Sequence, residues 1–368
     1  FINRNLEEFF NIQNFSSYFS IILMTIPCMV LINFSQNILK WTFERKKFLF
    51  LTIGFSFTQA TLLLIGVFYL DFNVTTALTI NLLNNIIFSS LGIIFVRKWI
   101  IFKSTKLYAN KLIIFAIPIG IACIIESFIP VIERQLILKY LNLYDLGIYA
   151  AASKIAMIIA LFVGAFQICW DPMAVAIFKE KNAYKTYNHV SKNFCTLICM
   201  MVLLIDLISK DIIVLFASER YEASSFIVFP LCMAFGVQSL GGITEIGINL
   251  SKRTYFFFIS YFFFLLTFFI TFFYLIPIFG ILGIAFSILA SQIAKTITSS
   301  FIAQIIFPIA WDYRPLLILP LITIIIGIVS NYGNIQNEIK ILLYSCFLIY
   351  LLCYFIFSLK TILKKEMR

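Results

Sequence analysis

The stretch LGIYAAASKIAMIIALFVGAFQICWDP, residues 146–172, places Lys154 inside an apolar run long enough to cross a lipid bilayer. A bilayer core of about 30 Å is spanned by a helix of about 20 apolar residues. A charge inside such a helix is costly, so it either reaches toward a membrane interface or has a function. The stretch therefore predicts a membrane-spanning helix with one unusual lysine, and leaves both explanations of the lysine open.

Composition places the whole chain in the same class. Of its 368 residues, 62% are hydrophobic and only 12% are charged, and the mean hydropathy is +1.00. Soluble domains carry about 25% charged residues, so we predict an all-α multi-pass membrane protein. The net charge of +11 first indicates membrane orientation, because Lys and Arg concentrate in cytoplasmic loops. We therefore predict no nucleic-acid partner.

Apolar runs of membrane-spanning length recur along the chain and predict eleven spans. Their expected ranges are 18–38, 48–70, 74–96, 112–132, 147–169, 194–216, 226–250, 255–275, 280–307, 315–332 and 340–360.

The charges between these spans fall mainly on one side. If the C-terminal tail is cytoplasmic, 20 of the 28 Lys and Arg residues lie in cytoplasmic segments. These residues are Lys40, Arg45, Lys46, Lys47, Arg97, Lys98, Lys103, Lys106, Lys111, Lys179, Lys181, Lys185, Lys192, Lys252, Arg253, Arg314, Lys360, Lys364, Lys365 and Arg368. This asymmetry supports the span count and a cytoplasmic C-terminus.

With eleven spans and that orientation, Phe1 begins outside the cytoplasm. The sequence starts without Met or a basic leader, so we expect an odd number of spans to be missing upstream. The external loops are short, which leaves no room for an extracytoplasmic domain.

Five ionisable residues fall inside the predicted spans: Glu126, Lys154, Asp206, Glu245 and Lys295. Ionisable groups within a membrane usually face the bundle interior or a water-filled cavity. Glu126 and Lys154 lie at similar depth on consecutive antiparallel spans and are predicted to pair. Glu245 and Lys295 form a second predicted pair, and Asp206 is expected nearest the midplane.

Three further patterns concern helix faces. In SQIAKTITSS, residues 291–300, the polar side chains share the face of Lys295. Asn81, Asn85 and Ser89 form an uncharged polar stripe that fits either helix packing or a cavity lining. YFFFISYFFFLLTFFITFFY, residues 255–274, is aromatic all round and predicts a lipid-facing helix without a functional role.

Enzyme and metal chemistry have little support in the sequence. The eight cysteines lie within or at the ends of apolar runs, where they act as small hydrophobes. His189 is the single histidine, and a metal site needs more ligands than it and Cys195 or Cys199 supply. We predict no catalytic residues, no metal and no bound cofactor.

Two segments also carry a family resemblance. ERQLILKYLNLYDLGIYAAASKIAMIIALFVGAFQICWDPMAVAIFK, residues 133–179, combines Glu133-Arg134, a Leu146–Tyr149 turn and a Trp170–Pro172 element. SERYEASSFIVFPLCMAFGVQSLGGITEIGINLSKRT, residues 218–254, has Tyr221 and Ala223 before a span that ends at Lys252 and Arg253. Both resemble bacterial O-antigen and capsule flippases, which are polysaccharide transporters of the multidrug/oligosaccharidyl-lipid/polysaccharide exporter superfamily.

The resemblance implies two six-helix lobes followed by two more helices, about fourteen in all. On that pattern, residues 1–111 are the second half of the first lobe and three helices are missing upstream. Residues 112–310 are the second lobe, and 311–368 are two additional helices with a basic tail.

The resemblance further implies translocation of an undecaprenyl-diphosphate-linked oligosaccharide across the bacterial cytoplasmic membrane by alternating access. The cations Arg134, Lys154 and Lys295 are candidates for binding the diphosphate. Glu126, Asp206 and Glu245 are candidates for balancing those charges or for binding a coupling H⁺ or Na⁺. Membrane lipids, a polysaccharide polymerase and a chain-length regulator are candidate partners.

Two other functions compete with this one. A drug or small-cation exporter of the same superfamily would favour acidic cavity residues. A membrane polysaccharide polymerase or ligase would usually carry a large external loop, which this chain lacks.

Overall fold

The computed structural model describes residues 15–69, 73–100, 106–180, 183–333 and 336–366. Helices make up nearly all of this part of the chain, and it contains no strand. The cations Lys103, Lys181 and Arg368 counted above lie outside the described residues. The chain divides into two compact units, residues 1–104 and 105–368. The predicted boundaries at 111 and 310 stay predictions.

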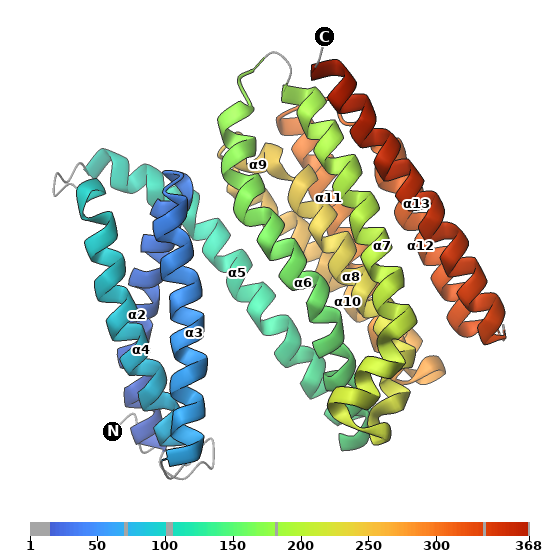
Figure 1. Ribbon diagram of the computed structural model, residues 1–368, viewed down its shortest axis with the longest axis horizontal. Helices are drawn as coiled ribbons and strands as arrows, with labels where there is room; N and C mark the ends of the chain where they lie inside the picture. Colours follow the sequence, from blue (N-terminus) through green and yellow to red (C-terminus); the bar gives the residue numbers. More distant parts are fainter. Residues whose placement is uncertain (1–14, 70–72, 101–105, 181–182, 334–335, 367–368) are drawn as a thin grey trace. The chain divides into compact units, whose positions relative to one another are not determined.

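The first unit is a three-helix bundle of α2 (Phe15–Trp41), α3 (Arg45–Tyr69) and α4 (Val74–Val96), followed by the short η1 (Arg97–Trp99). α4 packs against both α2 and α3, as Figure 1 shows. Asn85 and Ser89 of the predicted polar stripe are buried in this bundle. Their burial favours the helix-packing interpretation, although their own hydrogen bonds run to Asn81 and Ile86 of α4. The adjacent Asn84 makes the contacts between helices, since it accepts from the Thr58 hydroxyl and donates to Gln59 Oε1 of α3.

The second unit contains the remaining helices. Their bounds are α5 (Lys106–Tyr140), α6 (Leu143–Ile177), α7 (Ala183–Ala217), η2 (Glu219–Ser224), α8 (Ser225–Thr244), α9 (Ile246–Leu250), η3 (Thr254–Phe256), α10 (Phe257–Phe279), α11 (Ile281–Ile306), α12 (Tyr313–Tyr332) and α13 (Asn337–Glu366). α8 is the central helix, packed against α6, α7, α11 and α12.

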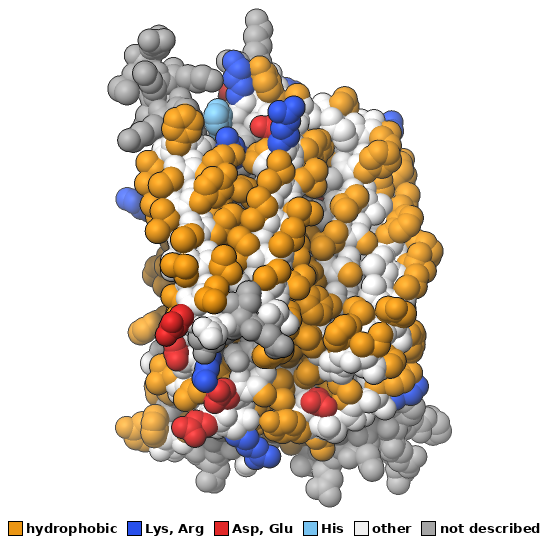
Figure 2. Space-filling view, turned by 90° about the vertical axis from the view of Figure 1, so that its right-hand side faces the viewer, with side chains coloured by type: hydrophobic (Ala, Val, Ile, Leu, Met, Phe, Trp, Pro, Cys, Tyr) orange, Lys and Arg blue, Asp and Glu red, His pale blue; other side chains and the backbone are white. Residues whose placement is uncertain are grey.

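Ten of the described helices are long and apolar enough to cross a membrane. The eleventh predicted span, 194–216, lies in α7, which is not among the ten. Asp206, Lys210 and Asp211 lower the apolar character of its C-terminal part. Hydrophobic side chains cover the middle of the face shown in Figure 2, and charged side chains gather toward its two ends. The protein is an all-α multi-pass membrane protein.

Two predicted helices differ from expectation. The predicted span 226–250 is interrupted at Glu245, which separates α8 from α9 in a segment that also contains Gly241, Gly242 and Gly247. The aromatic helix α10 is not uniformly lipid-facing, because it buries a stripe that includes Tyr261, Phe264 and Phe268. Aromatic composition alone does not reveal which face packs against neighbours.

Candidate functional site

Three helices of the second unit bring Glu126, Tyr261 and Lys295 together inside the apolar spans. The Lys295 ammonium on α11 donates a hydrogen bond to the Tyr261 hydroxyl on α10 at 3.0 Å. That hydroxyl donates in turn to Glu126 Oε2 on α5 at 2.7 Å. Lys295 Nζ also lies 4.2 Å from the centre of the Tyr261 ring, which adds a cation–π attraction. Tyr261 therefore links a buried cation to a carboxylate.

A fourth helix completes this arrangement. Gln238 of α8 donates through Nε2 to the other Glu126 oxygen. Lys295 interacts electrostatically with Glu245, and the Ser299 hydroxyl lies close to the Glu245 carboxylate. We call Glu126, Gln238, Tyr261, Glu245 and Lys295 the ion network. It holds two carboxylates, Glu126 and Glu245, for one ammonium.

The break between α8 and α9 gives Glu245 a special position in this network. The Glu245 backbone N–H still bonds to Gly241 O at 2.9 Å, but its φ of −80° and ψ of 0° end the α-helix there. Non-helical backbone at membrane depth is tolerated where it is buried in protein or lines a cavity. Transporters use such interrupted helices at their ion and substrate sites.

Two predicted cations lie outside the ion network. Lys154 is exposed on α6 and forms no ion pair with the described residues, and Glu126 bonds to Gln238 and Tyr261 instead. The predicted Glu126–Lys154 pair is therefore wrong. Arg134 is also exposed, whereas its neighbour Glu133 is buried.

The residues that carry the resemblance serve largely as packing contacts. The Tyr149 hydroxyl donates to Glu133 Oε2 at 2.6 Å, which joins α6 to α5. Gly147 lies against the Tyr221 ring, where an added Cβ would be 3.1 Å from a ring carbon. The Trp170 ring contacts Tyr187, with centroids 5.6 Å apart. These contacts stabilise the junctions between α5, α6, α7 and η2.

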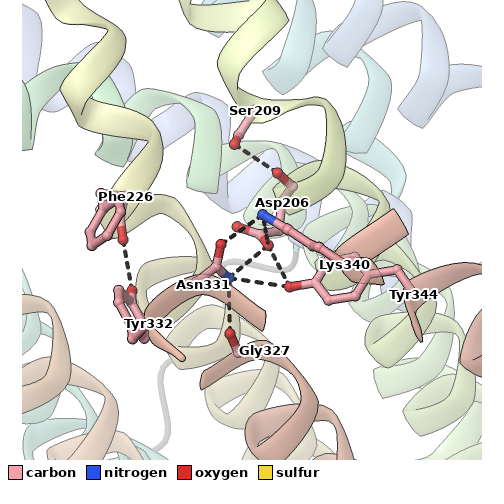
Figure 3. Close-up of polar contacts among 8 residues, drawn as sticks. All are labelled: Asp206, Ser209, Phe226, Gly327, Asn331, Tyr332, Lys340 and Tyr344. Atoms are coloured by element: carbon pink, nitrogen blue, oxygen red, sulfur yellow. Dashed lines mark hydrogen bonds and ion pairs between the residues drawn. The ribbon is translucent and has the colours of Figure 1, made fainter. Parts of the chain in front are cut away.

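Asp206 of α7 belongs to a separate buried cluster, shown in Figure 3. Its Oδ2 accepts hydrogen bonds from Tyr344 OH at 2.6 Å and Asn331 Nδ2 at 2.9 Å. Lys340 Nζ lies 3.5 Å from the same oxygen and donates to Asn331 Oδ1 at 2.7 Å. Because Asn331 is on α12 and the other two are on α13, Asp206 joins α7 to the two C-terminal helices.

The partners of Asp206 place it relative to the ends of α12 and α13. Its partners Asn331 and Lys340 lie within about one turn of the connection between α12 and α13. Asp206 therefore lies level with the end of α12 and α13 that holds this connection, and its depth in the membrane stays a prediction.

Several residues of these sites escaped sequence reasoning. Tyr261 was not singled out because it lies in the aromatic run, residues 255–274. Asn331 and Tyr344 were not singled out because they lie near the ends of their predicted spans. Gln238 did have a visible signal, because an amide inside an apolar span requires a hydrogen-bonding partner.

The described residues define a membrane protein with ten potential spans and a partly buried ion network. In this part of the chain no three His, Cys, Asp or Glu side chains gather as metal ligands would. A family model described as "polysaccharide biosynthesis protein" matches residues 1–226. The chain therefore belongs to the polysaccharide biosynthesis protein family. No curated protein and no solved structure gives a significant match.

Proposed function

We propose that the protein moves undecaprenyl-diphosphate-linked oligosaccharide units across the bacterial inner membrane by alternating access, without catalysing a covalent reaction. Membership of the polysaccharide biosynthesis family and the multi-pass fold support this role. A diphosphate with attached sugars cannot cross hydrocarbon unaided, because each unpaired polar group costs several kcal/mol there.

The observation that carries the proposal is the position of Lys295. This lysine lies inside an apolar span with only 8% of its surface exposed. It is linked to Glu126 through Tyr261 and interacts electrostatically with Glu245. A fixed ammonium attracts the diphosphate, while Glu126 and Glu245 compete with that anion for it. Uptake of H⁺ or Na⁺ by a carboxylate would release the ammonium for the substrate. The carboxylates would thereby couple ion binding to substrate binding.

The other predicted cations and the orientation belong to the same proposal. Arg134 and Lys154 are exposed and would meet the diphosphate outside the ion network. The C-terminus lies in the cytoplasm, and a polysaccharide polymerase and a chain-length regulator act on the translocated unit.

A drug or small-cation exporter is the second candidate, because the ion network contains more carboxylates than cations. The two functions make opposite demands on Lys295. A diphosphate requires the ammonium, whereas a cationic drug would bind better without it.

Complementation separates the two candidates. The complete protein is expressed in a host that lacks its own flippase, and surface polysaccharide and resistance to cationic drugs are both measured at equal protein abundance. Restored polysaccharide that is lost in Lys295→Ala supports the flippase. Drug resistance without restored polysaccharide would contradict it.

A further inference from the structure

A groove with a volume of about 440 Å³ lies between α11 and α12 on the second unit, with α8 as its floor. α11 packs against α8 and α10, whereas α12 packs against α7 and α8. Ile297 and Phe301 of α11 and Leu317 and Leu321 of α12 form its outer walls, and each is 59–66% exposed. The groove is therefore open to the surrounding hydrocarbon.

The length of the groove fits one leaflet of a bilayer. Its α11 wall runs from Ile293 to Gln304, about 16 Å at 1.5 Å per residue. Half of a hydrocarbon core is about 15 Å. The groove therefore matches an acyl chain of one leaflet in length, and its walls are mostly apolar along that length.

The polar end of the groove points to the kind of lipid. Gln304 and Tyr313 line this end, where Tyr313 OH donates to Gln304 Oε1 at 3.4 Å. Arg314 is exposed and lies three and seven residues before Leu317 and Leu321, on the same face of α12. The nearby Asp312 carboxylate accepts the backbone N–H of Arg314 at 3.4 Å. A guanidinium at the end of an apolar groove favours an anionic headgroup.

The groove is separated from the ion network by a close helix contact. An added Cβ at Gly241 of α8 would lie 2.9 Å from the Thr296 hydroxyl of α11. Thr296 also donates to Val237 O of α8 at 3.1 Å, whereas Lys295 bonds to Tyr261 of α10. A lipid chain in the groove therefore does not reach Lys295.

We propose that this groove binds one anionic phospholipid of the leaflet on the Arg314 side, with an acyl chain along Ile297, Phe301, Leu317 and Leu321 and the phosphate at Arg314. In the proposed orientation this is the cytoplasmic leaflet. The site is independent of substrate transport and is tested without a transport assay.

The test is native mass spectrometry of the complete protein released from nanodiscs that contain equal amounts of phosphatidylglycerol and phosphatidylcholine. Ile297→Trp and Leu317→Trp fill the groove and should each remove one retained phosphatidylglycerol. Ile305→Trp and Ile318→Trp are matched controls, because these residues are exposed on the same helices but outside the groove. Arg314→Gln should lower the preference for phosphatidylglycerol about fivefold.

Thermal unfolding in the same nanodiscs identifies any variant that is not folded, and Arg314→Gln tests the headgroup without altering the groove. Equal lipid retention by the wild type and the folded groove variants would overturn the proposal. Displacement of phosphatidylglycerol by added undecaprenyl phosphate, at equimolar amounts, would also overturn it by assigning the groove to a polyprenyl chain.

Discussion

Lys295 and Tyr261 are joined by a hydrogen bond of 3.0 Å and by the position of the ammonium over the ring. The Tyr261 hydroxyl, which accepts this hydrogen bond, donates a second one to Glu126. Tyr261 of α10 therefore bridges the Lys295 ammonium of α11 and the Glu126 carboxylate of α5.

Replacement of this hydroxyl should impair transport more than folding. Tyr261→Phe keeps the ring beneath Lys295 but removes the bonds to Lys295 and Glu126. Hydrogen bonds to charged groups contribute about 1.5–3 kcal/mol, so we expect a loss of translocation of at least about tenfold. Tyr274→Phe is the matched control, because Tyr274 is exposed on the same helix. Equal translocation by both variants would show that the hydroxyl has no part in transport.

Loss of Lys340 should destabilise the attachment of the C-terminal helices. Asp206 is buried and Lys340 is partly exposed, so we expect Lys340→Ala to cost about 1–3 kcal/mol by leaving a buried carboxylate without its cation. Asp206→Asn should largely rescue the Lys340→Ala protein, because it removes that charge. Thermal unfolding of the single and double variants gives the coupling energy, and strictly additive losses would rule out the pair as a stabilising contact.

Lys210→Ala is the control for this experiment. Its partner is Glu222, and both side chains are exposed, so little change in stability is expected.

A close contact between α8 and α12 predicts overpacking at Gly327. A Cβ at this position would overlap the Phe229 ring. Gly327→Ala should therefore destabilise the protein by about 1–3 kcal/mol, and Phe229→Leu should restore part of the loss. Gly164→Ala has open space around the added Cβ and should leave the unfolding temperature unchanged or higher. Similar unfolding temperatures for both alanine variants would refute the contact.

Glu44, in the connection between α2 and α3, should make the stability of the fold depend on pH. The hydrogen bond from Lys98, together with the charges of Lys47 and Lys98, holds the pKa of Glu44 below its ordinary value of 4.5. A pKa that is lower in the folded state stabilises the fold above the unfolded-state pKa, and this stabilisation is lost as pH falls through the folded value. Lys98→Ala should therefore reduce the acid sensitivity of unfolding between about pH 5 and pH 3. Identical pH profiles for the variant and wild type would contradict this.

The sequence predicted the membrane class and most of the spans because hydropathy and length suffice for both. It also identified Glu126, Glu245 and Lys295 as unusual, because charges within apolar spans are rare. It placed Lys295 with Glu245, and these two groups interact electrostatically. It did not predict Tyr261 and Gln238 as hydrogen-bonding partners. Similar depth suggested a Glu126–Lys154 pair, but depth says nothing about rotation around the helix axis, and only Glu126 faces α8 and α10.

The role of Tyr261 and the partners of Asp206 were missed for different physical reasons. In an all-apolar helix such as α10 the sequence contains no polar face from which the packed side can be inferred. Asp206 was recognised as an unusual charge, but its partners Asn331 and Lys340 lie near the ends of α12 and α13. Apolar composition defines such ends only to within several residues.

The central claim is that Lys295 supplies the cation that the substrate diphosphate meets in the membrane. It is tested most directly in liposomes that contain the complete protein and a fluorescent undecaprenyl-diphosphate glycan, with translocation measured by quenching from one side. We predict that Lys295→Ala abolishes protein-dependent translocation, that Lys295→Arg retains part of it because the charge is kept in a different shape, and that Ile305→Ala translocates normally. Wild-type translocation by folded Lys295→Ala would contradict the claim.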